Sequence, residues 1–229
     1  MNYNKMIDHT YLKPEATEKD IDKLIDEAKK YGFKTVCVNS SWVKYASEKL
    51  KGSYVEITSV VGFPLGAMIT QAKAHETKLA IDHGANEIDM VINIGRFKQG
   101  DYEYVLNDIK KVKEACGSHV LKVIIETALL STDEIKKATE IVMKSGAEFI
   151  KTSTGFSFRG ANLDDVKTMK SVCGDTLLIK AAGGISNMDD LKAMYEAGAT
   201  RFGTIVVQLR LLKDKNQKVD TNNKNLYIN

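Results

Sequence analysis

Short apolar segments and longer amphipathic segments alternate along most of the chain. The short segments are rich in β-branched residues and predict strands at residues 6–10, 35–38, 54–61, 87–92, 120–125, 148–151, 176–181 and 200–203. The longer segments repeat apolar residues at helical spacing and predict helices that include residues 18–31, 70–83, 102–115, 132–145 and 187–197. Such alternation is typical of right-handed βαβ units on a parallel sheet.

Glycine positions and the number of strands narrow the architecture. Gly32, Gly84, Gly146 and Gly198 each end a predicted helix shortly before a strand, so the helix-glycine-strand join is a repeated building block. Eight strands in 229 residues favour a (β/α)8 TIM barrel, which typically takes about 250 residues, over an open doubly wound sheet. No GxGxxG motif follows a strand, which also disfavours the open sheet.

Composition limits the class of protein. With 43% apolar residues and no linker, the chain is expected to form one core. The formal charge of +3 is spread along the chain, so nucleic acid is not an expected partner. The absence of a signal-like start or a long apolar span predicts a cytoplasmic protein without membrane contact. Cys37, Cys116 and Cys173 form no CxxC pair and predict neither disulfides nor a zinc site.

Two lysines end two similar segments, residues 150–156 and 179–185. Lys151 and Lys180 each follow the apolar part of a predicted strand, the position where TIM barrels carry their chemistry, and adjacent strands bring the two close together. Burial beside another cation lowers the pKa of a lysine and makes its amine a nucleophile that forms Schiff bases with carbonyl compounds. For either lysine alone, the alternatives are pairing with a carboxylate or binding phosphate as a fixed charge.

A carboxylate and a third lysine lie on neighbouring strands. Asp89 interrupts an apolar run, and a buried carboxylate there needs a cation, which Lys180 or Lys122 can supply. An ion pair without chemistry is the alternative for Asp89. His9 ends the first strand, where we expect it to cap the following loop rather than act across the barrel mouth. Histidines and carboxylates do not converge in the sequence, so we expect no catalytic metal.

A phosphate site is predicted after the seventh strand. Gly183 and Gly184 follow that strand and precede a helix, and backbone N–H groups at such a turn bind anions. Glycine turns are common, but phosphate sites are frequent in the later loops of a barrel.

The ordered segments match one family. The chain resembles the deoxyribose-phosphate aldolase family, short bacterial type, whose members are class I aldolases on a (β/α)8 barrel. The resemblance covers residues 6–204. The matching segments are residues 7–10, 12–17, 36–39, 60–66, 87–91, 121–127, 151–156 and 180–185.

The resemblance implies a reaction and roles for the lysines. It implies reversible aldol cleavage of 2-deoxy-D-ribose 5-phosphate to D-glyceraldehyde 3-phosphate and acetaldehyde, in deoxyribonucleotide and carbohydrate breakdown. Lys151 would form the Schiff base, Lys180 would lower its pKa, and Asp89 with Lys180 and a water would relay the proton. Lys122 would help to hold Asp89 ionised. No metal or organic cofactor is implied.

Further contacts and partners follow from the same comparison. A sugar phosphate and aldehydes are the expected partners. A homodimer is usual in the family, although the helix faces show no interface. Contacts with substrate or phosphate are expected for Cys37, Thr152, Gly155, Gly183 and Gly184. Simple core packing is the alternative for Cys37.

The chain departs from the family pattern near its C-terminus. Residues 205–208 read Ile-Val-Val-Gln where the family carries small residues and hydroxyls that bind phosphate. We therefore expect residues 1–204 to form the aldolase barrel and residues 205–229 to be a divergent, partly disordered segment. A frameshift is one hypothesis for this segment. Arg159 also stands where a small residue is usual, either as a phosphate contact or facing solvent.

Two rival functions remain open at this point. The first is a phosphate-binding isomerase or epimerase that uses Asp89 as its base, which leaves the lysine pair unexplained. The second is a catalytically impaired barrel that binds sugar phosphate without turnover because its phosphate site is altered. Retro-aldol cleavage of deoxyribose 5-phosphate excludes the second.

Overall fold

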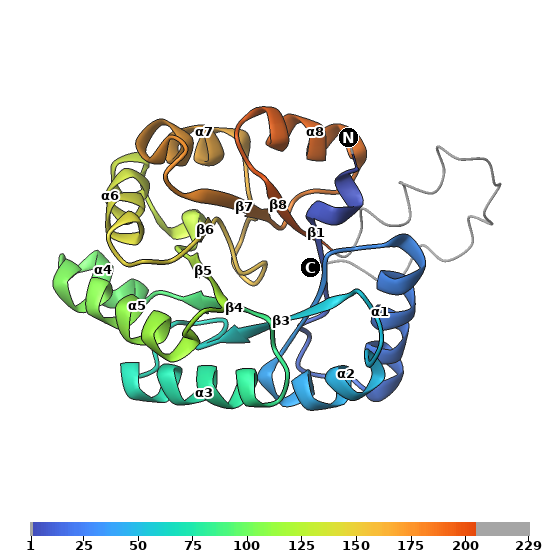
Figure 1. Ribbon diagram of the computed structural model, residues 1–229. Coiled ribbons are helices and arrows are strands. Elements are labelled where there is room, and N and C mark those ends of the chain that lie inside the picture. The colour runs from blue at the N-terminus through green and yellow to red at the C-terminus, as the bar shows by residue number, and fades with distance from the viewer. Residues whose placement is uncertain (1, 205–229) are drawn as a thin grey trace.

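Eight parallel strands pair in chain order and close into a barrel. The structure, a computed structural model, describes residues 2–204. The first strand pairs with the second on one side and with the eighth on the other, so the sheet has no edge (Figure 1). The strands are β1 (Ile7–Thr10), β2 (Thr35–Val38), β3 (Glu56–Val61), β4 (Glu87–Val91), β5 (Val120–Ile124), β6 (Phe149–Lys151), β7 (Leu178–Ala182) and β8 (Arg201–Thr204). The predicted TIM barrel is confirmed.

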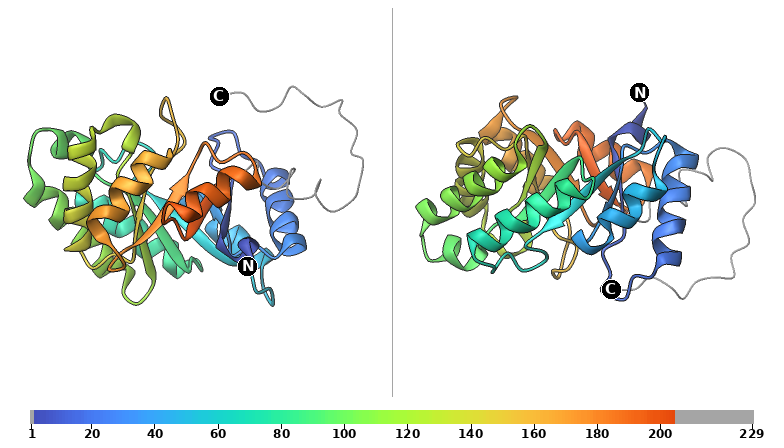
Figure 2. Two further views of the ribbon diagram at one scale, coloured as in Figure 1. Left: turned by 90° about the horizontal axis from the view of Figure 1, so that it is seen from above. Right: turned by 60° about the horizontal axis from the view of Figure 1, so that its bottom comes forward.

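Helices surround the barrel on its outside (Figure 2). They are α1 (Glu18–Tyr31), α2 (Val43–Lys49), α3 (Thr70–Asp82), α4 (Ile94–Lys98), α5 (Tyr102–Cys116), α6 (Thr132–Met143), α7 (Leu163–Cys173) and α8 (Met188–Glu196), with short 3-10 turns η1 (Tyr3–Met6), η2 (Ser40–Trp42) and η3 (Thr127–Leu129). The five predicted helices are present. α2 and α4 were not predicted because they are too short to show a helical period. α7 was also missed.

Capping explains where the predicted helices begin and end. α1 begins at a capping box in which Thr17 and Asp20 exchange side-chain and backbone hydrogen bonds. It ends at Gly32, whose φ of 70° lies in the left-handed region that glycine adopts without steric cost. Ser131 and Glu134 form a second capping box at the start of α6.

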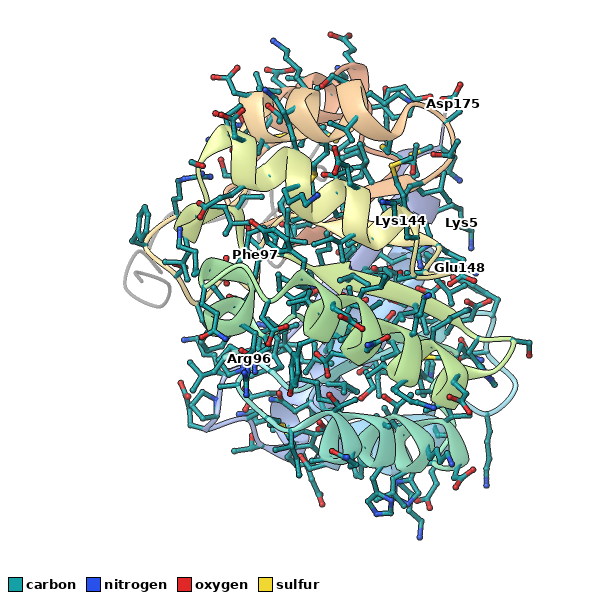
Figure 3. The ribbon with its side chains drawn as sticks, turned by 90° about the vertical axis from the view of Figure 1, so that its left-hand side faces the viewer. Lys5, Arg96, Phe97, Lys144, Glu148 and Asp175 are labelled. Carbon is teal, nitrogen blue, oxygen red and sulfur yellow. The ribbon has the colours of Figure 1, made fainter. Side chains whose placement is uncertain are left out.

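The apolar core lies between the barrel and its helices. Residues of one strand face, such as Ile88, Val123 and Ile179, pack in this core together with helix residues such as Ile21 and Ile109. On the outer surface the helices turn charged side chains to solvent, as Figure 3 shows for Arg96, whereas the adjacent Phe97 is buried. The opposite strand face points into the barrel, and this is where the polar residues gather.

The barrel interior is filled by three layers of four inward-facing residues. Alternate strands supply each layer, as in other TIM barrels, but most side chains here are polar or charged instead of branched and apolar. The lower layer is Thr35, Glu87, Phe149 and Arg201; the middle layer is Asp8, Thr58, Lys122 and Lys180; the upper layer, at the C-terminal ends of the strands, is Cys37, Asp89, Lys151 and Gly203.

Strand register ties the layers together. Each middle-layer residue pairs with an upper-layer residue on one neighbouring strand and with a lower-layer residue on the other. Lys180, for example, is in register with Lys151 of β6 and with Arg201 of β8. A stagger of this kind follows from the tilt of the strands in a closed barrel. Charged residues of successive layers are therefore neighbours.

Residues 205–229, for which we expect a divergent and partly disordered segment, lie outside the described residues, and so does the altered sequence 205–208. Among residues 2–204, no helix has the length and apolar character needed to cross a membrane.

A buried ion pair joins α3 to α5. Lys73 and Asp108 are fully buried, and Lys73 Nζ donates to Asp108 Oδ2 at 2.6 Å and to the Val91 carbonyl at 2.9 Å. The lysine therefore connects both helices to the end of β4. Removing one partner of such a pair leaves an uncompensated charge in the interior.

We predict that Lys73→Met lowers the free energy of unfolding by roughly 3–5 kcal/mol, because Asp108 loses its counter-charge. Urea denaturation measures the change. Lys111→Met is the matched control, since Lys111 and Glu114 form an exposed pair, and we expect a loss of no more than about 1 kcal/mol. A Lys73→Met variant as stable as this control would contradict the prediction.

Candidate active site

Asp89 binds three lysines inside the barrel. Its Oδ2 accepts hydrogen bonds from Lys151 and Lys180, each at 2.7 Å, and its Oδ1 accepts one from Lys122 at 2.9 Å. The carboxylate and the lysines Lys122 and Lys180 are fully buried, and Lys151 is 3% exposed. β4 to β7 thus bring together the four residues that the sequence singled out for catalysis.

A second set of charges supports this cluster from below. Asp8 accepts from Lys180 and, at 2.7 Å, from Arg201 Nε. Glu87 accepts from Lys122 at 2.6 Å and from Arg201. Sequence reasoning gave no role to Glu87 and Arg201. Side chains alternate between the two faces of a strand, and Glu87 is two residues before Asp89. This alternation could have placed Glu87 on the same face as Asp89, inside the barrel.

The charges act on Lys151 and Lys180 in opposite directions. Burial, with Lys180 as a neighbouring cation, lowers the pKa of Lys151 and outweighs the opposing effect of Asp89. Burial also disfavours the charged form of Lys180, but Asp8 and Asp89 together raise its pKa above the usual value. Lys122, Lys151 and Lys180 hold the pKa of Asp89 well below its usual range despite burial. Lys151 is therefore the lysine best suited to lose its proton.

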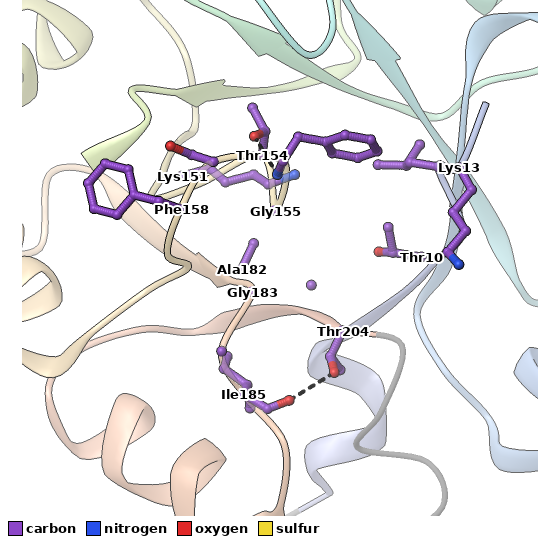
Figure 4. A pocket seen from close by; sticks show the side chains of 15 residues that line it. Thr10, Lys13, Lys151, Thr154, Gly155, Phe158, Ala182, Gly183, Ile185 and Thr204 are labelled. Atoms are coloured by element: carbon purple, nitrogen blue, oxygen red, sulfur yellow. Dashed lines mark hydrogen bonds between the residues drawn. The ribbon is translucent and has the colours of Figure 1, made fainter. Parts of the chain in front are cut away.

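A cavity of about 760 Å³ opens above Lys151 (Figure 4). Its walls come from the end of β1 and the following loop, from Thr154 and the loop after β6, from the loop after β7, and from Gly203 and Thr204 of β8. Within the part of the chain that the structure describes, Lys151 is the one member of the charge cluster that lines this cavity. A ligand in the cavity meets the amine of Lys151 before any other member.

Glycines shape two walls of the cavity. Gly155, Gly183 and Gly184 line it, and the last two have φ of 73° and 76° ahead of α8. At Gly160 an added Cβ would lie 2.4 Å from the carbonyl carbon of Gly183, so only glycine lets the loops after β6 and β7 approach this closely. The backbone in this region is open to a ligand.

Two residues predicted to contact substrate lie beside the cavity rather than in its lining. Thr152 is buried, and its hydroxyl accepts a hydrogen bond from the Ala182 N–H at 3.1 Å, which ties β6 to β7. Cys37 is buried with Leu12 and Val60 in a small apolar cluster next to the charged residues. Substrate contact by Thr152 or Cys37 stays a prediction.

Arg159 and His9 have protein partners. Arg159 binds the Asp165 carboxylate and the Thr127 carbonyl, so it braces the loop after β6. His9 Nε2 lies 2.8 Å from Glu27 of α1, with its ring against Phe33, on the outward face of β1. His9 therefore joins a strand to a helix instead of capping the loop after β1.

Glu126 and Thr154 are a pair that sequence reasoning missed. Glu126 has φ 54° and ψ 67°, an uncommon conformation for a residue with a side chain. Its carboxylate accepts from the Thr154 hydroxyl, and Thr154 in turn accepts from the Phe156 N–H at 3.0 Å. Burial raises the pKa of Glu126 above its usual value. The pair fixes the start of the loop that follows Lys151.

Within residues 2–204, no group of three or more histidine, cysteine, aspartate or glutamate side chains has an arrangement suited to a metal ion.

The fold and the site together fit an enzyme that attacks a carbonyl with a lysine amine. A TIM barrel carries a buried lysine of lowered pKa at the C-terminal end of a strand, beside a protonated lysine and a carboxylate. The family model for DeoC/LacD family aldolases matches residues 4–207. The chain belongs to this aldolase family.

Curated relatives and solved structures agree with this assignment. The chain is 68% identical to the deoxyribose-phosphate aldolase of Mycoplasmopsis synoviae, over 96% of this chain and 99% of the relative, and 60% identical to that of Metamycoplasma arthritidis, over 95% and 100%. A putative deoxyribose-phosphate aldolase from Coccidioides immitis superposes with a TM-score of 0.91 at 38% identity, over 94% of this chain and 86% of that one. The aldolase QR15 superposes with a TM-score of 0.88 at 41% identity, over 92% of this chain and 96% of that one.

We predict that native Cys37 resists alkylation between pH 7 and 9. Burial, with the Asp89 carboxylate nearby, raises the pKa of its thiol to about 11, and the reactive thiolate forms only as the pH rises through that value. Iodoacetamide labelling followed by peptide mass analysis tests this, with the urea-unfolded chain as the control. Labelling of native Cys37 as fast as in urea would contradict it.

Proposed function

We propose that this chain is a class I aldolase that reversibly cleaves 2-deoxy-D-ribose 5-phosphate to D-glyceraldehyde 3-phosphate and acetaldehyde through a Schiff base on Lys151. The observation that carries the proposal is the position of Lys151. It lines the cavity, its pKa is lowered, and its amine lies 2.7 Å from the carboxylate that it shares with Lys180. The names of the relatives support the choice of substrate.

The first step forms the covalent link. The neutral amine of Lys151 adds to C1 of the open-chain aldehyde, and loss of water from the carbinolamine gives a protonated imine. In the protonated imine the Lys151 nitrogen keeps one N–H and carries a positive charge, so it can still donate to Asp89 Oδ2.

The second step breaks the bond between C2 and C3. Loss of the proton from the C3 hydroxyl releases glyceraldehyde 3-phosphate, and the electron pair of the broken bond moves to the imine and leaves an enamine on Lys151. The enamine then takes a proton at its terminal carbon, and hydrolysis returns acetaldehyde and the free amine. Asp89 and Lys180, which are 2.7 Å apart, are the proposed proton relay through a water.

The loop after β7 is the proposed phosphate site. Gly183 and Gly184 line the cavity in the loop that leads to α8, and the positive end of that helix dipole favours an anion. Gly155 lines the cavity from the loop after β6, and Lys13 adds a positive charge from the loop after β1. Most of the groups proposed to bind phosphate are backbone N–H groups of glycines. Phosphate binding therefore depends more on the conformation of the loops than on side chains.

Rival functions are less well supported. An isomerase or epimerase that uses Asp89 as its base gives no role to the lowered pKa of Lys151. A barrel that binds sugar phosphate without turnover has no support among the named relatives. A homodimer and a cytoplasmic location stay predictions from the sequence. One similar structure, a deoxyribose phosphate aldolase from Aeropyrum pernix, is described as a tetramer. It superposes with a TM-score of 0.85 at 29% identity, over 92% of this chain and 89% of that one.

We predict that borohydride reduction in the presence of deoxyribose 5-phosphate adds one adduct to the parent chain and none to Lys151→Ala, because Lys151 lines the cavity and its pKa is lowered. Intact-mass analysis measures the adduct. Lys170→Ala is the control, since Lys170 lies at the surface with Asp175, and should be labelled like the parent. An adduct of equal yield on Lys151→Ala would overturn the proposal.

We predict that Asp89→Asn separates imine formation from proton transfer. The variant keeps Lys151 and should still be trapped by borohydride with acetaldehyde. Exchange of the acetaldehyde methyl protons with D₂O should slow by about 10²–10⁴-fold, the usual contribution of a general base. Proton NMR follows the exchange. Exchange at the parent rate would remove Asp89 from the relay.

A further inference from the structure

Glu87 and Arg201 form a charged pair on the lower layer of the barrel, where no step of the proposed reaction uses them. Arg201 donates to the Glu87 carboxylate, and the two side chains are 5% and 9% exposed. Neither residue lines the cavity above Lys151. The middle layer separates them from any ligand there, so their buried charges need another explanation.

Short ion pairs connect both residues to the reactive end of the barrel. Glu87 accepts from Lys122 at 2.6 Å, and Lys122 donates to Asp89 at 2.9 Å. On the other side, Arg201 Nε donates to Asp8 at 2.7 Å, and Asp8 binds Lys180. Each path reaches the Asp89 carboxylate that contacts Lys151. Charge on the lower layer therefore acts on Lys151 through a medium that excludes water.

The buried cluster is balanced in charge when Lys151 is neutral. Its carboxylates are Asp8, Glu87 and Asp89, and its other bases are Lys122, Lys180 and Arg201, so three negative charges face three positive ones. A proton on Lys151 would add a fourth positive charge. A surplus charge in the interior is costly unless it is paired. The balance thus favours the neutral, nucleophilic amine.

We propose that Glu87 and Arg201 are positioning residues that set the protonation of Lys151 through charge balance, without contact with substrate. Removal of the negative charge at Glu87 lets Lys151 lose its proton at lower pH, and removal of the positive charge at Arg201 makes it hold its proton to higher pH. This inference rests on the proposed function, because it concerns the same amine.

The other titratable groups near Lys151 are common to all variants in the test. Lys180 of β7 and Asp89 of β4 contact Lys151 or its carboxylate partner, and Cys37 of β2 and Glu126, just after β5, interact with it electrostatically. Cys37 is neutral at working pH because its thiol pKa is raised to about 11. A difference between variants therefore reports the charge removed from the lower layer.

The experiment measures the pH at which Lys151 becomes nucleophilic, without using the aldol substrate. Acetylacetone reacts with neutral amines to give an enaminone that absorbs in the near ultraviolet. Initial rates of this reaction are followed from pH 5 to 9.5 for the full chain. Intact-mass analysis and Lys151→Ala assign the signal, and circular dichroism verifies the fold of each variant.

Opposite shifts are the expected result. Glu87→Gln should lower the midpoint by about one pH unit and Arg201→Gln should raise it by about one, the size expected for one charge roughly 10 Å away at an effective dielectric constant of about 20. Arg201→Lys keeps the charge and should leave the midpoint near that of the parent. The double variant Glu87→Gln/Arg201→Gln loses one charge of each sign and should also titrate like the parent.

Midpoints that do not move, or that move in the same direction in both single variants, would overturn the inference. Loss of a purely structural contact gives no reason for the two variants to shift the midpoint in opposite directions. If Glu87→Gln does not fold, Arg201→Gln and Arg201→Lys still test the inference. It requires a raised midpoint in Arg201→Gln and a midpoint near that of the parent in Arg201→Lys. Failure of the proposed function has a different signature, since the parent would then show no labelling of Lys151 at any pH.

Discussion

The Asp89 carboxylate, shared by three buried lysines, is the interaction on which the rest of the barrel depends. Several charges inside a protein cost far more in lost hydration than one ion pair returns. The chain meets this cost with a connected cluster in which each carboxylate has at least two basic partners. Because such charges fill most of the inside of the barrel, the large apolar core lies between the strands and the helices.

One arrangement gives two neighbouring lysines different properties. Lys180 has two carboxylate partners, Asp8 and Asp89, whereas Lys151 has Asp89 alone and faces the cavity. The difference comes from layer position, since Lys180 lies in the middle layer between charges above and below. Chemically identical side chains one strand apart can therefore serve as a cation and as the proposed nucleophile.

Sequence reasoning recovered the barrel, and it singled out charged residues that the structure brings together, for physical reasons. Strands in a closed parallel sheet are buried on both faces, so Asp89, Lys122 and Lys151 stand out as charges within apolar runs. Glu87 and Arg201 were missed because they begin their strands, where a charged residue usually faces solvent. The pair of Lys73 and Asp108 escaped for a similar reason, since both residues are on helices and their burial depends on how α3 packs on α5. Glu126 and Thr154 meet across a loop, which no local pattern predicts.

Gly203 gives the upper layer of the barrel its particular shape. A Cβ at this position would lie 3.1 Å from the Ala182 Cβ and 3.3 Å from the Lys180 Cε, so a side chain here would press against both residues. Gly203 also lines the cavity above Lys151. The absence of a side chain at this position therefore lets the Lys180 side chain pass close to β8 on its way to Asp8 and Asp89.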